Sequence, residues 1–296
     1  IISSNLITPE VALTLFDSYV KPVVLYGCEI WSLASYKNLK TGKYFCDSHT
    51  QNLINIHESE KVQTDFSKFI LGVSNKTHNL ASLAELGRYP LSIDMKIKII
   101  KYWLRVTNLE SDNLLQKSLY DISSLDDAGH TVWLSAVRKI LEHNGFSYVW
   151  KNKGKDVIPD VFLKKLRIRL QDQHAQLFHS SLYNDNVING SGAKLRTYRN
   201  FKVNYVKEKY LSCIRSFKYR KALSKIRLSS HALRIEVGRY NHELVEERIC
   251  EFCDSGQIES EEHFLLHCPL YRDERNHLIS TLSLSAQEFS LNLFFP

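Results

Sequence analysis

Long hydrophobic runs are missing from this sequence of 296 residues. The longest apolar stretches, such as Val23 to Tyr26, are far shorter than the roughly 18–20 residues that a membrane-spanning helix needs. The sequence also lacks a basic start followed by an apolar stretch and a small-residue cleavage site, so it predicts no secretory signal. We therefore expect no membrane partner.

Methionine is scarce as well. The only methionine is Met95, and the first residue is Ile1. Because a natural translation product begins with methionine, we expect a fragment or the product of an incompletely assigned gene. A catalytic domain is one candidate for the upstream material.

Familiar catalytic signatures are absent too. The glycines are scattered and form no glycine-rich phosphate loop, and there is no nucleophile elbow. The six cysteines do not resemble a secreted disulfide framework, because three of them lie close together near the end of the chain beside histidines. This pattern favours reduced cysteines and a metal cluster in an intracellular protein, and the expected location is nuclear and cytoplasmic.

Most of the sequence instead carries helical periodicity. The stripe formed by Ile93, Ile97, Ile100 and Leu104 is one example. The predicted fold class is therefore mainly α, with short hairpins expected only near 228–237 and 250–258. Helices are expected near 9–20, 49–71, 77–86, 92–106, 112–125, 130–143, 159–177 and 202–228, and loops at 35–48 and 184–192.

The net charge of +7 is unevenly distributed. Residues 1–150 carry 15 Lys/Arg and 15 Asp/Glu, residues 151–240 carry 21 and 6, and residues 241–296 carry 3 and 11. The central block thus has a net charge of +15 and the end of the chain a net charge of −8. Such a block favours contact with a polyanion, although lysines on solvated helix faces would give the same pattern.

Tyrosines are interleaved with the basic residues of this block. Tyr198, Tyr205, Tyr210 and Tyr219 could stack on unpaired bases, or they could pack inside helices. The basic side chains predicted to contact RNA or DNA phosphates are Arg196, Arg199, Lys202, Lys207, Lys209, Arg215, Lys218, Arg220, Lys221, Lys225, Arg227, Arg234 and Arg239.

A metal site is predicted at Cys250-x2-Cys253-x9-His263-x4-Cys268. Two thiolates three residues apart can hold one ion from a tight turn, and a helical turn can return the histidine and the third cysteine. Four protein ligands leave no open position, so we expect a structural Zn²⁺. The alternative is three buried free cysteines. For the histidine, His263 is preferred over His267, which directly precedes Cys268, and over His277.

Three stretches carry a resemblance to a known family. They are Phe16 to Trp31 (FDSYVKPVVLYGCEIW), Ala84 to Leu91 (AELGRYPL), and Cys250 to Arg275 with its sequence EHFLLHCPLY. Together they resemble the C-terminal part of the reverse transcriptase of LINE-type (non-LTR) retrotransposons. The resemblance implies a thumb-like helical region at 1–110, a basic helical region facing nucleic acid at 111–240, and a CCHC zinc knuckle with a tail at 241–296.

In that family the polymerase centre lies upstream, in an aromatic-x-Asp-Asp hairpin. The only Asp-Asp here is Asp126-Asp127, with no aromatic residue two positions before it, and we expect it to lie in a loop between helices. The chain alone is thus not expected to be an enzyme, although its parent would be an RNA-directed DNA polymerase. The predicted function is nucleic-acid binding beside an upstream polymerase core. The alternatives are a domesticated stand-alone nucleic-acid-binding protein and a decayed element product.

Overall fold

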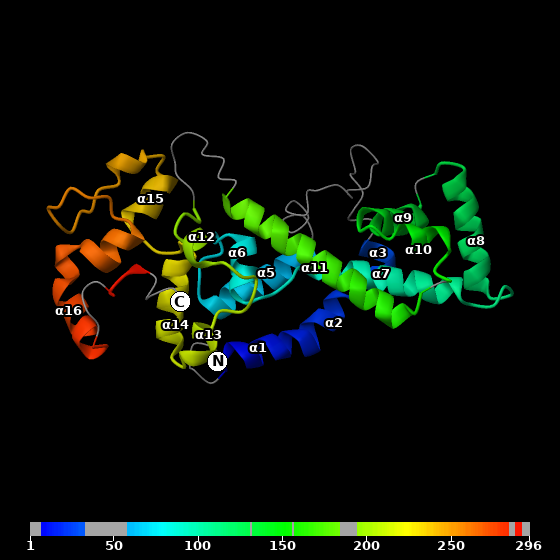
Figure 1. The fold of residues 1–296 in the computed structure, drawn as a ribbon, viewed down its shortest axis with the longest axis horizontal. Helices are drawn as coiled ribbons and strands as arrows, with labels where there is room; N and C mark the ends of the chain where they lie inside the picture. Colours follow the sequence, from blue (N-terminus) through cyan, green and yellow to red (C-terminus); the bar gives the residue numbers. More distant parts are fainter. Residues whose placement is uncertain are drawn as a thin grey trace. The chain divides into compact units, whose positions relative to one another are not determined.

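The computed structural model describes residues 7–32, 58–130, 132–155, 157–183, 194–283 and 288–291. These residues form helices joined by turns, and no strand is found among them (Figure 1). The predicted mainly α fold class is confirmed. The loops expected at 35–48 and 184–192, and the expected helix start at residue 49, lie outside the described residues. No helix in the described ranges combines the length and the apolar character needed to cross a membrane.

The chain divides into two compact units that are not consecutive in sequence. Unit 1 consists of residues 1–9, 67–87 and 178–296, and unit 2 of residues 10–66 and 88–177. The units therefore do not follow the three consecutive regions expected from the sequence. The difference arises because two helices, α5 (Glu58–Leu71) and α11 (Pro159–Tyr183), each contribute residues to both units.

Unit 2 begins with a nearly continuous helical segment. The segment comprises α1 (Pro9–Leu15), the π-helical turn η2 (Phe16–Val20), α2 (Lys21–Val24) and α3 (Cys28–Trp31). The unit then contains α7 (Leu91–Thr107), α8 (Leu114–Asp127), α9 (Trp133–His143) and α10 (Ser147–Lys151). Of these elements, α2, α3 and the short α10 were not expected from the sequence.

The core of unit 2 is built around the apolar stripe of α7. Ile93, Ile97, Ile100 and Leu104 are buried there with residues of α9, α10 and α11. The Trp103 and Trp150 rings stack with their centroids 5.6 Å apart. The stripe that predicted the helix thus also forms its packing face.

Unit 1 is built from shorter elements. Its described elements, besides the ends of α5 and α11, are α6 (Asn79–Glu85), α12 (Tyr198–Phe201), α13 (Tyr210–Cys213), α14 (Phe217–Arg227), α15 (Arg234–Tyr240), η4 (Val245–Glu247), η5 (His263–His267), η6 (Pro269–Tyr271) and α16 (Arg272–Thr281).

The long basic helix expected at 202–228 is interrupted. The Lys202 ammonium donates to the Val206 carbonyl oxygen at 2.7 Å, so the chain folds around it. A second break falls at Ile214, whose backbone is extended. There the Arg220 guanidinium donates to the carbonyl oxygens of Ile214 and Arg215, at 2.7 and 2.6 Å. Buried basic side chains therefore take the place of helical hydrogen-bond donors at these breaks.

The two expected hairpins have different outcomes. Near residues 250–258, an antiparallel bridge between Ile249 and Ile258 confirms a short hairpin. The hairpin expected at 228–237 is wrong, because α15 begins at Arg234. In that segment the Ile235 amide donates to the Glu259 carbonyl oxygen at 3.2 Å instead.

Candidate metal centre

Cys250 and Cys253 lie on the short hairpin. The Cys250 amide donates to the Gln257 carbonyl oxygen at 2.9 Å, and the Glu259 amide donates to the Arg248 carbonyl oxygen at 2.9 Å. The turn between the two sides requires a left-handed residue, which Gly256 supplies with a φ of +66°. These contacts fix the two thiols on one side of the turn.

His263 and Cys268 come from the opposite segment. Residues 263–267 form one π-helical turn, closed by the Cys268 amide, which donates to the His263 carbonyl oxygen at 2.7 Å. A π-turn joins residues five apart, which is the spacing of these two residues. The x4 gap in the sequence therefore matches a local turn that places imidazole and thiol on the same side.

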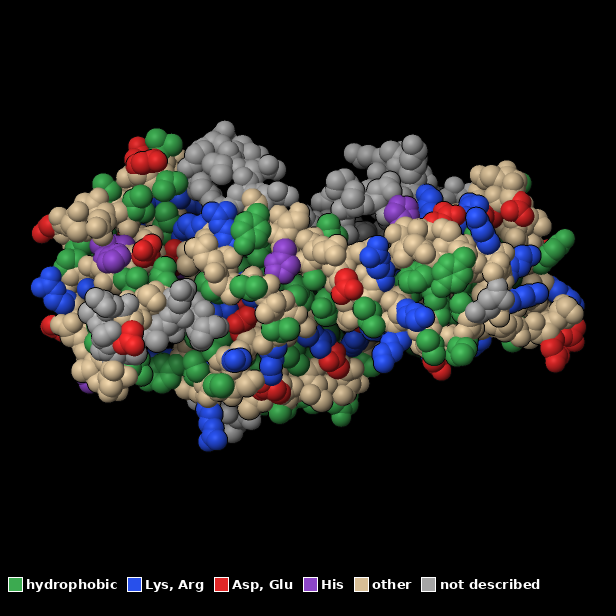
Figure 2. All heavy atoms as spheres, viewed as in Figure 1, with side chains coloured by type: hydrophobic (Ala, Val, Ile, Leu, Met, Phe, Trp, Pro, Cys, Tyr) green, Lys and Arg blue, Asp and Glu red, His purple; other side chains and the backbone are tan. Residues whose placement is uncertain are grey.

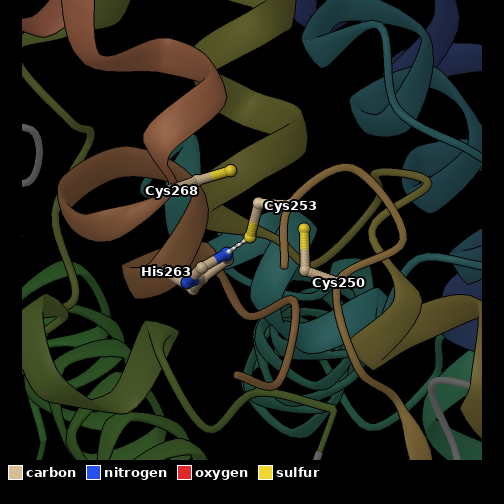
Figure 3. A group of neighbouring side chains, drawn as sticks. All are labelled: Cys250, Cys253, His263 and Cys268. Atoms are coloured by element: carbon tan, nitrogen blue, oxygen red, sulfur yellow. Dashed lines mark hydrogen bonds between the residues drawn. The ribbon is translucent and has the colours of Figure 1, made fainter. Parts of the chain in front are cut away.

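The four side chains converge on one point (Figure 3). Their ligand atoms all lie within 4.8 Å of one another, and Cys253 Sγ is 3.4 Å from His263 Nε2. A tetrahedral ion with bonds of ~2.3 Å to sulfur and ~2.0 Å to nitrogen would separate its ligands by about 3.5–3.8 Å. The group could thus hold one metal ion after only a small contraction.

The hydrogen bonds around the cluster suit metal binding. His263 Nδ1 is 2.8 Å from Gln257 Oε1, an amide oxygen that can only accept. Nδ1 therefore carries the proton, and Nε2 presents its lone pair to the thiols. Burial lowers the pKa of His263, which favours this neutral form. Gln257 was not among the predicted site residues. Its position between the ligands Cys253 and His263 in the sequence could have suggested a hydrogen bond to the histidine.

The cysteines differ in how readily they ionise. Burial raises the pKa of the Cys250 thiol to about 11. Hydrogen bonds from Ser255, whose hydroxyl is 3.1 Å from the sulfur, lower the pKa of Cys253. Metal binding must release the Cys250 proton, so metal affinity should rise with pH.

Of the three histidines considered, His263 is the one that lies with the cysteines. His263 is buried within the cluster, whereas the side chain of His267 is 53% exposed and lies 3.8 Å from Glu262. His277, on α16, is exposed and is not part of the cluster. Successive residues of the turn point in different directions, and only His263 faces the thiols.

The segment that carries His263 is anchored by the buried carboxylate of Glu261. Arg196 donates to both oxygens of Glu261 at 2.7 and 2.9 Å, and His231 Nε2 is 2.9 Å away. Burial alone would raise the pKa of Glu261, but the hydrogen bond with His231 and the charge of Arg196 lower it to about 2. Arg196 was predicted to contact nucleic acid, and Glu261 was not among the predicted site residues.

Three of the predicted nucleic-acid contacts are buried, and for these the prediction is wrong. Lys202, Arg220 and Arg227 are only 2%, 3% and 1% exposed. Arg227 donates to Glu85 at 2.5 Å and lies 2.8 Å from Glu208, and the Phe201 ring centroid is 4.3 Å from its guanidinium carbon. A buried cation requires a buried partner, so these side chains stabilise unit 1 and cannot reach a phosphate.

Three more of the predicted contacts are engaged in ion pairs at the edge of the core. Arg196 and Arg239 pair with Glu236 at 2.7 and 3.1 Å, and Arg234 pairs with Glu243 at 2.9 Å. The remaining seven are exposed or half-buried; they are Arg199, Lys207, Lys209, Arg215, Lys218, Lys221 and Lys225.

The four tyrosines of the basic block also divide into buried and exposed side chains. Tyr198, Tyr205 and Tyr210 are buried, and the Tyr210 hydroxyl is 2.7 Å from Ser224 Oγ. Tyr219 is 64% exposed. Of the two open interpretations, packing therefore holds for the first three, and only Tyr219 remains available for stacking.

The Asp126-Asp127 pair lies in the last turn of α8, not in a loop. The buried Asp126 carboxylate accepts a hydrogen bond from Ser135 Oγ and another from Arg138, the latter at 3.3 Å. Asp126 therefore joins α8 to α9 within unit 2.

Comparisons with known proteins found no matching family model, curated protein or solved structure.

Proposed function

We propose that the chain is a nucleic-acid-binding protein whose C-terminal part is held by one structural zinc ion. The observation that carries this proposal is the convergence of Cys250, Cys253, His263 and Cys268. Three thiolates and one imidazole form a soft ligand set typical of tetrahedral zinc. Because all four positions come from the protein, the ion would stabilise the fold and would not act in catalysis.

The accessible basic residues of unit 1 support nucleic-acid binding. Lys218 and Lys225 lie seven residues apart on α14, which places them on the same side of the helix. The exposed ring of Tyr219 lies beside them, while Arg220, Ser224 and Arg227 form the buried side. The lysines could meet phosphates and the ring could stack on a base. On the face drawn in Figure 2, Lys and Arg are interspersed with apolar and acidic side chains, so we assign binding to local groups of residues.

We further propose that the chain is the C-terminal part of a LINE-type reverse transcriptase. Support comes from the three sequence stretches that resemble that family, the last of which includes all four ligands. In this role the chain would hold RNA or DNA near an upstream polymerase core inside the cell. A stand-alone domesticated protein would use the same residues. Sequence upstream of Ile1 that contains palm motifs would support the first role.

Metal analysis tests the zinc component. Purified protein should contain about one zinc per chain, and Cys253→Ser should lower that content sharply. Replacing zinc with Co²⁺ should give the absorption of a tetrahedral thiolate site. A Cys213→Ser variant serves as a control, because Cys213 is exposed and outside the cluster. A metal-free protein with a fully folded C-terminal segment would refute the zinc site.

A salt titration tests the nucleic-acid component. Replacing Lys209, Arg215, Lys218 and Lys225 by Ala should weaken binding to all base sequences alike. The slope of log affinity against log salt should flatten by about 0.7–0.9 for each phosphate that the variant no longer neutralises. The control removes the same charge from exposed positions of unit 2: Lys61, Lys101, Arg105 and Lys117. If both sets of substitutions weaken binding and flatten the slope equally, the basic residues of unit 1 are ordinary solvated side chains and do not form a binding surface.

A further inference from the structure

A lysine-bearing turn at residues 151–155 of unit 2 was not among the predicted contacts. Lys151, Lys153 and Lys155 are all exposed. The backbone of the turn is closed by the Lys153 amide, which donates to the Trp150 carbonyl oxygen at 3.0 Å, and by the Gly154 amide, which donates to that of Val149 at 2.9 Å. The three ammonium groups therefore project from an ordered turn.

Gly154 fixes this turn on the core. It is buried with a φ of +71°, and a Cβ atom at this position would lie only 2.5 Å from Leu104 Cδ2. Trp150, next to the turn, stacks on Trp103. Close approach of backbone to core is possible here only for glycine, so the lysines have a defined position relative to unit 2.

Lys153 occupies a conformation that lysine disfavours. Its φ is +52°, in the left-handed region where glycine and asparagine are accommodated at lower cost. Within the described part of the chain, Lys153 makes no ion pair or side-chain hydrogen bond, and the backbone hydrogen bonds of the turn hold its conformation. The two amide hydrogen bonds of the turn make Lys153 the left-handed residue of the cap that ends α10, and its side chain is exposed.

An exposed aromatic ring accompanies the lysines. Tyr148 is 51% exposed and lies three residues before Lys151 on α10, so the two side chains share one side of that helix. The Tyr148 ring meets Phe146 edge-on, with the centroids 6.4 Å apart. A flat ring beside several ammonium groups suits a strand that offers both phosphates and unpaired bases.

We propose that Tyr148 and the lysines of this turn form a contact for single-stranded nucleic acid on unit 2. The ammonium groups neutralise successive phosphates, and the Tyr148 ring stacks on a base. The inference rests on the proposed nucleic-acid function, but it uses none of the residues assigned to that function in unit 1. It also does not depend on the metal centre.

The test uses the full chain and two probes, a labelled oligouridylate and a labelled duplex DNA. Replacing Lys151, Lys153 and Lys155 by Ser should reduce the salt slope for oligouridylate by about 0.7 for each phosphate left without its ammonium partner. The charge-matched control replaces Lys61, Lys101 and Lys117 by Ser, all of which are exposed in unit 2. Equal reductions in both variants would overturn the proposal.

Two single substitutions separate this contact from simple charge attraction. Lys153→Gly should leave the Tm unchanged or raise it, because glycine tolerates the positive φ, and should still weaken binding. Tyr148→Ala should weaken oligouridylate binding several-fold with an unchanged salt slope, and should affect duplex binding less. Tyr120→Ala, at an exposed position on α8, is the control for Tyr148→Ala. Wild-type affinity in both Lys153→Gly and Tyr148→Ala would refute the contact.

The design also distinguishes the two proposals. Loss of binding only with the unit 1 substitutions would support the α14 surface and refute the lysine turn. Loss only with the unit 2 substitutions would support the turn and refute that surface. If neither set alters the salt slope, both proposals fail.

Discussion

Some charged residues of unit 1 form ion pairs and hydrogen bonds inside the fold. Glu261 accepts hydrogen bonds from Arg196, Thr197 and His231 and is only 1% exposed. Its neighbour Glu262 is exposed. Two adjacent glutamates therefore have opposite environments, and that difference gives a matched pair of substitutions.

We expect Glu261→Gln to lower the free energy of unfolding by about 1–3 kcal/mol, because Arg196 would keep only Glu236 as a buried anionic partner and His231 would lose the charge of Glu261. Chemical unfolding in the presence of zinc measures this. Glu262→Gln should change stability by less than about 0.5 kcal/mol, as expected at an exposed position. Equal stability of the two variants would contradict the anchoring role of Glu261.

The start of helix α7 is held by a buried carboxyl group that comes from helix α5. In unit 2 the buried carboxylate of Glu60 accepts hydrogen bonds from the amides of Leu91 and Ser92, at 3.1 and 2.6 Å. These amides belong to the first turn of α7, where no intrahelical acceptor exists. Burial raises the pKa of Glu60 to about 7, even though these amide hydrogen bonds oppose the shift.

The raised pKa predicts how the stability of unit 2 depends on pH. Between the ordinary value of 4.5 and about 7, the unfolded chain ionises before the folded one, so stability should fall as the pH rises. The slope should not exceed about 1.4 kcal/mol per pH unit. Glu60→Gln should remove this component, whereas Glu58→Gln, at an exposed position of the same helix, should retain it. Thermal unfolding across this pH range would check the difference, and identical pH profiles for wild type and Glu60→Gln would contradict it.

At the scale of the whole molecule, the metal site lies in one unit only. Its four ligands belong to unit 1, while the large core around α7 belongs to unit 2. Removing zinc with a chelator should therefore increase amide hydrogen exchange in residues 241–283 and leave the exchange of α7 and α9 nearly unchanged. Loss of protection in both units at once would show that the zinc site stabilises more than its own unit.

The place of the Asp126-Asp127 pair in the fold bears on whether the chain can catalyse DNA synthesis. Asp126 is buried against Ser135 and Arg138, so the Asp-Asp pair is not arranged to bind two metal ions at an exposed polymerase centre. We expect no primer extension by this chain with Mg²⁺ and deoxynucleotides. Incorporation that Asp126→Ala abolishes would disprove this expectation, provided that the variant remains folded.

The sequence alone determined what depends on local spacing. Helical periodicity specified α7, α9 and α11, because each needs one apolar side. The four metal ligands were also readable, because a hairpin turn and a π-turn bring them together over a short stretch of chain.

Only the tertiary structure decided which charges are accessible. Lys218 and Arg227 belong to one basic helix, yet Lys218 faces solvent and Arg227 pairs with Glu85, which is distant in the sequence. Burial and ion pairing depend on which segments meet in space, and composition cannot supply that information. For the same reason the sequence could indicate a turn at residues 151–155 but not its place on the core, which the contact of Gly154 with Leu104 decides.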